Sequence, residues 1–242
     1  MCPNSPPRER TSPHQQEQPA KTPAILFDLD GTLMDSNYEH VAAWQLAFRR
    51  AGLEVPNAFL HRCIGMRGDL LARAVHKEFG KKTGNDAVAK LEKLHRGYFE
   101  KTLPSVKLLP GAAALLKALT RRKVPWAIAT GGDKSTALKM TAPLGMPPAA
   151  CVVTADDFDQ AKPEPDVFLL AARRLSMALT DCIVVGDSVW DLLGARRAKA
   201  VGVGLLCGGY GTSELTQAGA YRVYKHPADL LEHLAEIGID GG

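Results

Sequence analysis

The sequence lacks several features that would assign it to a class at once. No apolar run is long enough to span a bilayer, and no apolar signal-peptide segment occurs near its start. No Lys/Arg-rich block with interleaved aromatic residues is present, and the formal net charge is only +4, which does not suggest a nucleic-acid partner. These absences predict a cytoplasmic protein that binds neither membranes nor nucleic acids.

Cysteine is scarce, and its spacing matches no cysteine-based metal or redox motif. The five cysteines form no Cys-x-x-Cys pair and are odd in number: Cys2, Cys63, Cys151, Cys182 and Cys207. Buried reduced thiols are therefore expected rather than disulfides, which fits a reducing compartment.

What is present has the composition of an ordinary globular protein. The 242 residues are 45% hydrophobic and 23% charged, which suits one large domain or a core with an insertion. Residues 1–22 are the exception, because they are rich in Pro, Gln, Ser and charge. We expect this segment to be disordered.

The first motif with chemical content is a pair of carboxylates after a short apolar segment. Residues 24–27 predict a buried strand, and Asp28 and Asp30 follow it one residue apart, before Gly31 and Thr32. Two like charges at the carboxyl end of a strand, where open α/β sheets bind ligands, require a metal ion, a phosphate or both. A solvated turn is the alternative, whereas the spacing excludes a calcium-binding loop.

Periodicity divides the rest of the chain into two parts. Between residues 36 and 105 only helical patterns occur, at residues 36–52, 56–63, 69–79 and 86–100. Helices and strands alternate from residue 110 onward. The predicted strands are 126–130, 151–154, 182–186, 201–206 and 221–224, and the predicted helices are 110–122, 134–144, 165–176, 189–199 and 227–234.

Repeated strand–helix units predict an α/β fold with a doubly wound parallel sheet that is covered on both faces. The strand at residues 24–27 must join this sheet. We therefore expect a core of residues 23–35 and 106–242, with residues 36–105 inserted as an all-helical cap.

Two further polar groups are predicted at the mouth of this sheet. Thr130 ends the second core strand ahead of Gly131, where a hydroxyl and free backbone N–H groups suit an anionic oxygen, although a helix N-cap is the alternative. Lys162 precedes Pro163 and Pro165, which hold it in extended backbone. Its charge could bridge a carboxylate and a phosphoryl oxygen, although a lone lysine is more often a surface residue.

The last motif is a second pair of acids. Asp187 follows an apolar strand, and Asp191 lies one helical turn later on the same side. Hard oxygen ligands grouped in this way suit Mg²⁺. The alternative is that Asp187 is an N-cap and Asp191 is placed in the first turn by the helix dipole.

Taken in order, these motifs resemble those of the haloacid dehalogenase superfamily. They are Asp-x-Asp-Gly-Thr, a strand-end Thr, Lys-Pro-x-Pro-Asp and Gly-Asp-Ser-x-x-Asp, and the resemblance covers about residues 23–225. It implies a doubly wound core with a mobile cap. It also implies a magnesium-dependent phosphatase that acts on a small phosphorylated metabolite, such as a sugar phosphate or phosphoglycolate.

Carried over to this sequence, the resemblance makes Asp28 the nucleophile that forms an aspartyl-phosphate and Asp30 the general acid and base. Thr130, Gly131 and Lys162 would bind the phosphoryl group. The implied ligands of Mg²⁺ are Asp28, the backbone carbonyl of Asp30, Asp187 and Asp191.

Residues 35–44 resemble the start of the cap in β-phosphoglucomutases and related sugar-phosphate phosphatases. The resemblance implies that His40 faces the site, where it would bind substrate and hydrogen-bond Asp30, and an exposed helix residue is the alternative. Trp44 is expected in the core more than in the site. Arg67 is predicted to bind substrate, but its offset by one residue from the mutase pattern favours hydrolysis. A phosphoglucomutase-like isomerase and a non-catalytic binding module remain the alternatives, and the oligomeric state stays open.

Overall fold

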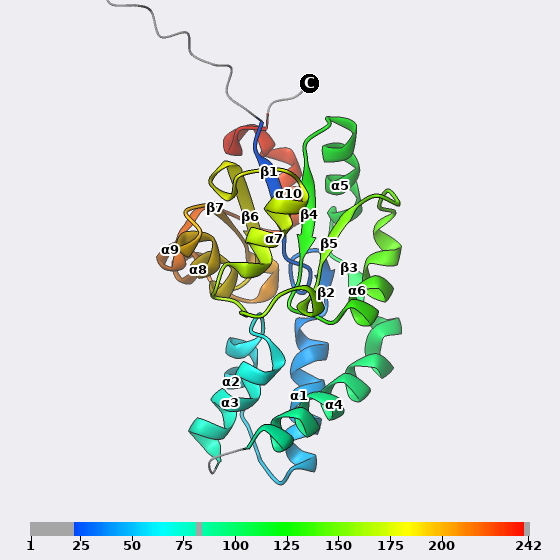
Figure 1. Ribbon diagram of the computed structural model, residues 1–242, viewed down its shortest axis with the longest axis vertical. Helices are drawn as coiled ribbons and strands as arrows, with labels where there is room; N and C mark the ends of the chain where they lie inside the picture. Colours follow the sequence, from blue (N-terminus) through cyan, green and yellow to red (C-terminus); the bar gives the residue numbers. More distant parts are fainter. Residues whose placement is uncertain (1–21, 81–83, 240–242) are drawn as a thin grey trace, which may run out of the picture.

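The computed structural model describes residues 22–80 and 84–239 (Figure 1). Its main sheet has six parallel strands in the order β5-β4-β1-β6-β7-β8. The sheet confirms the predicted α/β fold class, whereas the segment predicted to be disordered falls, apart from residue 22, outside the described residues. The strands are β1 (Ala24–Phe27), β4 (Trp126–Ala129), β5 (Cys151–Val153), β6 (Cys182–Gly186), β7 (Val201–Leu205) and β8 (Ala220–Tyr224).

The sheet is covered on both faces because alternate residues of each buried strand point to opposite sides. In β1, Ile25 and Phe27 belong to one hydrophobic core, and Ala24 and Leu26 belong to another. The first core contains residues of α5 (Ala112–Arg121), α6 (Lys134–Thr141) and α10 (Pro227–Glu232), and the second contains residues of α7 (Asp166–Arg174) and α8 (Val189–Arg197). The arrangement is doubly wound, as predicted.

Several local elements differ from the prediction. Helix α9 (Thr212–Ala218) was not predicted, because seven residues with two buried positions carry little helical periodicity. The pair β2 (Met34–Asp35) and β3 (Lys107–Leu108) forms a separate antiparallel ribbon whose strands are too short to show alternation. The helix predicted over residues 134–144 ends at Thr141 and continues as a 3₁₀ turn, Ala142–Leu144.

Four helices follow one another in sequence between β2 and β3: α1 (Asn37–Arg50), α2 (Asn57–Cys63), α3 (Gly68–Phe79) and α4 (Asn85–Thr102). They share a hydrophobic core of their own, to which Val41, Phe48, Leu60 and Leu91 contribute. Figure 1 shows them together below the sheet. This arrangement supports the proposed division into a core and an inserted cap. No helix in residues 22–80 and 84–239 has the length and apolar character needed to cross a bilayer.

Candidate active site

The first acid of the site lies where the strand order reverses. From β1 the sheet continues through β4 and β5 on one side and through β6, β7 and β8 on the other. In open α/β sheets this point forms a crevice at the carboxyl ends of the strands. Asp28 directly follows β1, is only 4% exposed, and donates its backbone N–H to the carbonyl of Val185 in the neighbouring strand at 2.9 Å.

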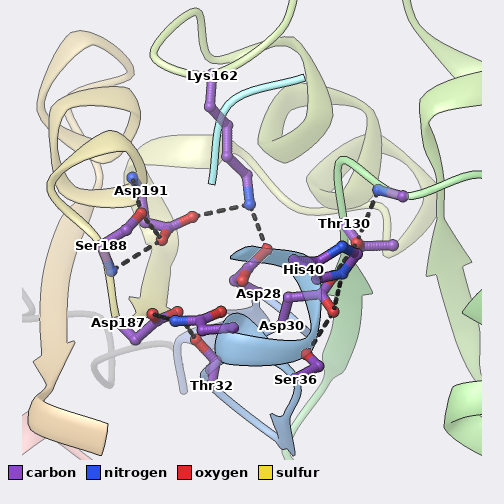
Figure 2. Close-up of polar contacts among 12 residues, drawn as sticks. Asp28, Asp30, Thr32, Ser36, His40, Thr130, Lys162, Asp187, Ser188 and Asp191 are labelled. Carbon is purple, nitrogen blue, oxygen red and sulfur yellow. Dashed lines mark hydrogen bonds and ion pairs between the residues drawn. The ribbon is translucent and has the colours of Figure 1, made fainter. Parts of the chain in front are cut away.

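Three buried acids that are distant in sequence meet at this crevice. Asp28, Asp187 and Asp191 each offer a carboxylate oxygen, and these atoms lie within 4.8 Å of one another. The ammonium of Lys162 contacts Asp28 and lies 2.8 Å from Asp191 Oδ1 (Figure 2). One ammonium cannot neutralise three ionised carboxylates, so the cluster fits a divalent cation with oxygen ligands.

The electrostatics of the cluster follow from burial. Burial raises the pKa of Asp28 well above its usual range, although the neighbouring Lys162 opposes this shift. Burial followed by the charge of Asp191 raises the pKa of Asp187 to about 7. Burial alone would lower the pKa of Lys162, but Asp191 and Asp28 outweigh it and raise that pKa. Lys162 therefore stays protonated, but its single positive charge does not balance the charges of three ionised acids.

Two side chains to which the sequence assigned no role hold Asp187. The hydroxyl of Thr32 donates to Asp187 Oδ1 at 2.8 Å, and the amide of Asn37, the first residue of α1, donates to Oδ2 at 2.8 Å. A Cβ atom on Gly208 would lie 1.7 Å from Asp187 Oδ2, so only glycine leaves room for this carboxylate. Asn37 follows the first motif by a few residues, but its residue type alone gives no metal-site signal.

The N-cap interpretation of Asp187 is wrong, because Ser188 caps α8. The Ser188 hydroxyl donates to Asp191 Oδ2 at 2.6 Å, and the two residues form a capping box at the start of the helix. Asp191 therefore has a structural partner in the first turn, while its Oδ1 lies at 2.8 Å from Lys162. Asp187 is left to face the acid cluster.

Asp30 belongs to the same motif but is outside the three-acid cluster. Its Oδ1 accepts a hydrogen bond from the Ser36 hydroxyl at 2.6 Å and lies 3.0 Å from His40 Nε2, so the predicted contact between His40 and Asp30 is present (Figure 2). Burial would raise the pKa of Asp30, but His40 and the hydrogen bonds to its carboxylate outweigh burial and lower it. The pKa of Asp28 is therefore raised and that of Asp30 is lowered, although the two acids are one residue apart in the same motif.

His40 has a second imidazole partner on α4. His40 Nδ1 lies 3.0 Å from His95 Nε2, and the His40 ring stacks on Phe99 with 3.7 Å between centroids. Burial and the neighbouring His40 hold the pKa of His95 well below its usual range. His95 was not predicted, since a histidine inside a helical pattern carries no sign of what it faces.

Thr130 and Gly131 line a cavity of about 220 Å³ that Asp28 and Asp30 also line. The N-cap interpretation of Thr130 is wrong, because Asp133 caps α6 by accepting from the Thr136 N–H at 3.1 Å. Thr130 instead accepts a hydrogen bond from the backbone N–H of Gly132 at 3.0 Å and is 1% exposed.

The cap contributes the other wall of this cavity. Arg67 lines it, but its guanidinium pairs with Asp69, at 2.7 Å from Nε to Oδ1, and also donates to the carbonyl of Asp159 in the core. Trp44 is 3% exposed and belongs to the cap core, as expected, yet it also lines the cavity and stacks on His95 at 4.2 Å. The cavity thus lies between the sheet and the helices of α1–α4.

Comparison with known proteins agrees with this geometry. The family model described as haloacid dehalogenase-like hydrolase matches residues 22–199. The chain belongs to the haloacid dehalogenase-like hydrolase family. Within this family, hexitol phosphatase A of Escherichia coli (strain K12) is 36% identical over 176 residues, which are 72% of this chain and 78% of the relative.

A phosphoglycolate phosphatase of Xanthomonas campestris is 29% identical to this haloacid dehalogenase-like hydrolase over 186 residues, which cover 76% of this chain and 83% of the relative. A solved structure of a hydrolase from Pseudomonas syringae superposes with a TM-score of 0.85 and is 41% identical. That alignment covers 89% of this chain and 99% of the other, so it includes both the sheet and the α1–α4 helices.

Proposed function

We propose that the protein is a magnesium-dependent phosphomonoester hydrolase that acts on a small phosphorylated metabolite through an aspartyl-phosphate on Asp28. The observation that carries the proposal is the convergence of Asp28, Asp187 and Asp191 on one point with Lys162 as their only neighbouring ammonium among the described residues. The names of the relatives, a hexitol phosphatase and phosphoglycolate phosphatases, support a phosphorylated substrate.

Asp28 is the proposed nucleophile because it ends the central strand and faces the cavity. Lys162 holds the carboxylate in place and would neutralise charge that develops on the phosphoryl oxygens. Asp28, Asp187, Asp191 and the backbone carbonyl of Asp30 would hold Mg²⁺, which when bound supplies the remaining positive charge for attack by a carboxylate.

Asp30 is the proposed general acid and base. Its side chain lines the cavity, and His40 and Ser36 fix its orientation. Because its pKa is lowered, Asp30 must first take up a proton, which it would give to the leaving alkoxide in the first step. In the second step it would take a proton from the water that attacks the aspartyl-phosphate. Thr130 and the Gly131 backbone would bind phosphoryl oxygens beside it.

Hydrolysis is favoured over mutase activity by the contacts of Arg67. Its guanidinium is shared between the Asp69 carboxylate and the Asp159 carbonyl. A mutase must hold a second phosphate group while the first is transferred, and an arginine that is already paired is poorly placed to do so. The predicted cytoplasmic location remains a prediction.

The test is release of phosphate from p-nitrophenyl phosphate with and without Mg²⁺. We expect turnover that requires the metal and is lost in Asp28→Asn. Under single turnover with a ³²P-labelled substrate and acid quench, the label should be found on the peptide that contains Asp28. Turnover by Asp28→Asn, or label on another residue, would overturn the nucleophile assignment, and conversion of β-glucose 1-phosphate to glucose 6-phosphate would favour the mutase.

A further inference from the structure

Glu92 is a carboxylate of the cavity that the proposed chemistry does not use. It lies on α4 and lines the same cavity as Asp28 and Asp30. No hydrogen bond or ion pair of its side chain occurs within residues 22–80 and 84–239. Burial, followed by the charge of Asp69, raises the pKa of Glu92. A half-buried acid without a partner is available to a ligand.

The cations around Glu92 are already engaged. Arg67 is paired with Asp69, Arg73 donates to Asn85 Oδ1 at 2.7 Å, and Arg96 lies 3.7 Å from Asp133 Oδ2. Arg67 is therefore not free to bind a carboxylate on a substrate without losing Asp69, and Arg73 does not line the cavity. Arg96 does line it and is held only by an exposed ion pair. Of the two charged side chains by which α4 lines the cavity, Arg96 has an ion pair and Glu92 has none, so an anionic leaving group beside Glu92 would meet an uncompensated negative charge.

A neutral leaving group that carries hydroxyls would instead be attracted to Glu92. A hydroxyl donates a hydrogen bond to a carboxylate, and such charge-assisted bonds are stronger than neutral ones. The Met66 side chain, which lines the same cavity and is partly exposed, offers an apolar surface to the carbon chain of such a group. Hydroxyls and C–H groups side by side are the chemistry of sugars and polyols.

We propose that Glu92 determines specificity: it accepts hydrogen bonds from the hydroxyls of a sugar or polyol phosphate and disfavours substrates whose leaving group carries a carboxylate. This inference rests on the phosphatase activity proposed above. It assigns the choice between a sugar phosphate and phosphoglycolate to one side chain of the cap.

A structural role for Glu92 is the competing explanation. Its Oε1 lies 3.0 Å from the position that a Cβ atom on Gly68 would take, beside the first turn of α3. A carboxylate near a helix N-terminus stabilises the helix by charge. In that case its replacement would affect all substrates alike, because only the stability or position of the cap would change.

The experiment compares kcat/KM at saturating Mg²⁺ for a hexitol 6-phosphate, 2-phosphoglycolate and p-nitrophenyl phosphate. The variants are Glu92→Gln and the charge reversal Glu92→Lys. The control is Glu100→Gln, which makes the same substitution on the same helix at an exposed residue outside the cavity. Melting temperatures verify that each variant is folded.

For Glu92→Gln we expect kcat/KM on the hexitol phosphate to fall about tenfold, since a charge-assisted hydrogen bond becomes a neutral one. Turnover of p-nitrophenyl phosphate, which has no hydroxyls, should stay within about twofold. In Glu92→Lys the ratio of phosphoglycolate to hexitol phosphate turnover should rise further, and Glu100→Gln should match the wild type.

The inference would be overturned if kcat/KM changed equally on all three substrates, or if the ratio of phosphoglycolate to hexitol phosphate turnover stayed the same in both variants. Continued turnover of p-nitrophenyl phosphate would in that case leave the phosphatase proposal intact. A wild-type protein that prefers phosphoglycolate would overturn it as well. If the wild type hydrolyses none of the three substrates with Mg²⁺ present, the phosphatase proposal fails, and the specificity inference fails with it.

Discussion

Replacing Asp187 with Asn is expected to stabilise the metal-free protein at neutral pH and to remove its response to Mg²⁺. Asp187 is 2% exposed and shares the crevice with two other buried carboxylates. Burial and Asp191 raise its pKa from the ordinary value of 3.8 to about 7. Ionisation of this carboxyl therefore destabilises the folded protein.

The sign and size of the effect follow from linkage. Between pH 3.8 and about 7 the folded state keeps a proton on Asp187 that the unfolded chain has lost. The free energy of unfolding therefore falls as pH rises through this window, by about 1.4 kcal/mol per pH unit and about 4 kcal/mol in all. Asparagine does not titrate, so its advantage over the wild type should grow with pH by the same amount and level off above pH 7.

The absolute difference between the two proteins also contains a pH-independent part. Thr32 and Asn37 donate to separate oxygens of Asp187, whereas an Asn side chain has one acceptor oxygen and can keep only one of these two hydrogen bonds. The slope against pH is the quantity to measure. Urea unfolding in EDTA at pH 5, 6, 7 and 8 gives it, with Asp86→Asn, an exposed residue in the first turn of α4, as the control.

With Mg²⁺ at about 100 times its dissociation constant the wild type should gain about 2.7 kcal/mol and the variant much less. A difference between wild type and Asp187→Asn that stays constant from pH 5 to 7 would refute the assigned electrostatics. Equal stabilisation of both proteins by Mg²⁺ would refute the metal site.

Three further substitutions probe the neighbouring contacts. Lys162→Met removes the ammonium that contacts Asp28 and Asp191, so metal-free stability in urea should fall by about 3 kcal/mol or more and p-nitrophenyl phosphate turnover should be lost. Asn37→Ala removes a hydrogen bond to Asp187, so a Mg²⁺ titration should show half-maximal activity at about tenfold higher metal, with little change in kcat at saturation. His95→Phe leaves His40 without its imidazole partner, so kcat should fall about tenfold while KM changes little; an unchanged kcat would contradict a positioning role.

The residues of the core were accessible from the sequence because each marks the end of a strand. Asp28, Thr130 and Asp187 follow apolar segments whose lengths and flanking glycines predict buried parallel strands. Parallel strands that carry polar groups at their carboxyl ends bring them to one edge of the sheet. The topology therefore follows from the pattern once the strands are recognised, and the acid cluster follows from the topology.

The contacts of the cap could not be predicted in the same way. His95 and Glu92 lie on α4 within a helical pattern of ordinary polar residues, and only the packing of α4 against α1 and α3 decides that both line the cavity. Asn37 is an example nearer the motif, since it reaches Asp187 across 150 positions in the sequence. Helical periodicity shows which face is buried but not what that face meets.

The sheet forms one wall of the cavity and helices α1–α4 form the other, and different interactions position the residues of each wall. The proposed chemistry and the choice of substrate therefore depend on different parts of the fold. Backbone register fixes the acids: Phe27 pairs with Val185 across β1 and β6, so Asp28 and the residues that follow β6 keep their spacing while the sheet is intact. Glu92 is placed by the packing of α4 against α1 and α3. A substitution on α4 can therefore change which leaving group is accepted without moving the nucleophile, which is why p-nitrophenyl phosphate is the reference substrate for Glu92.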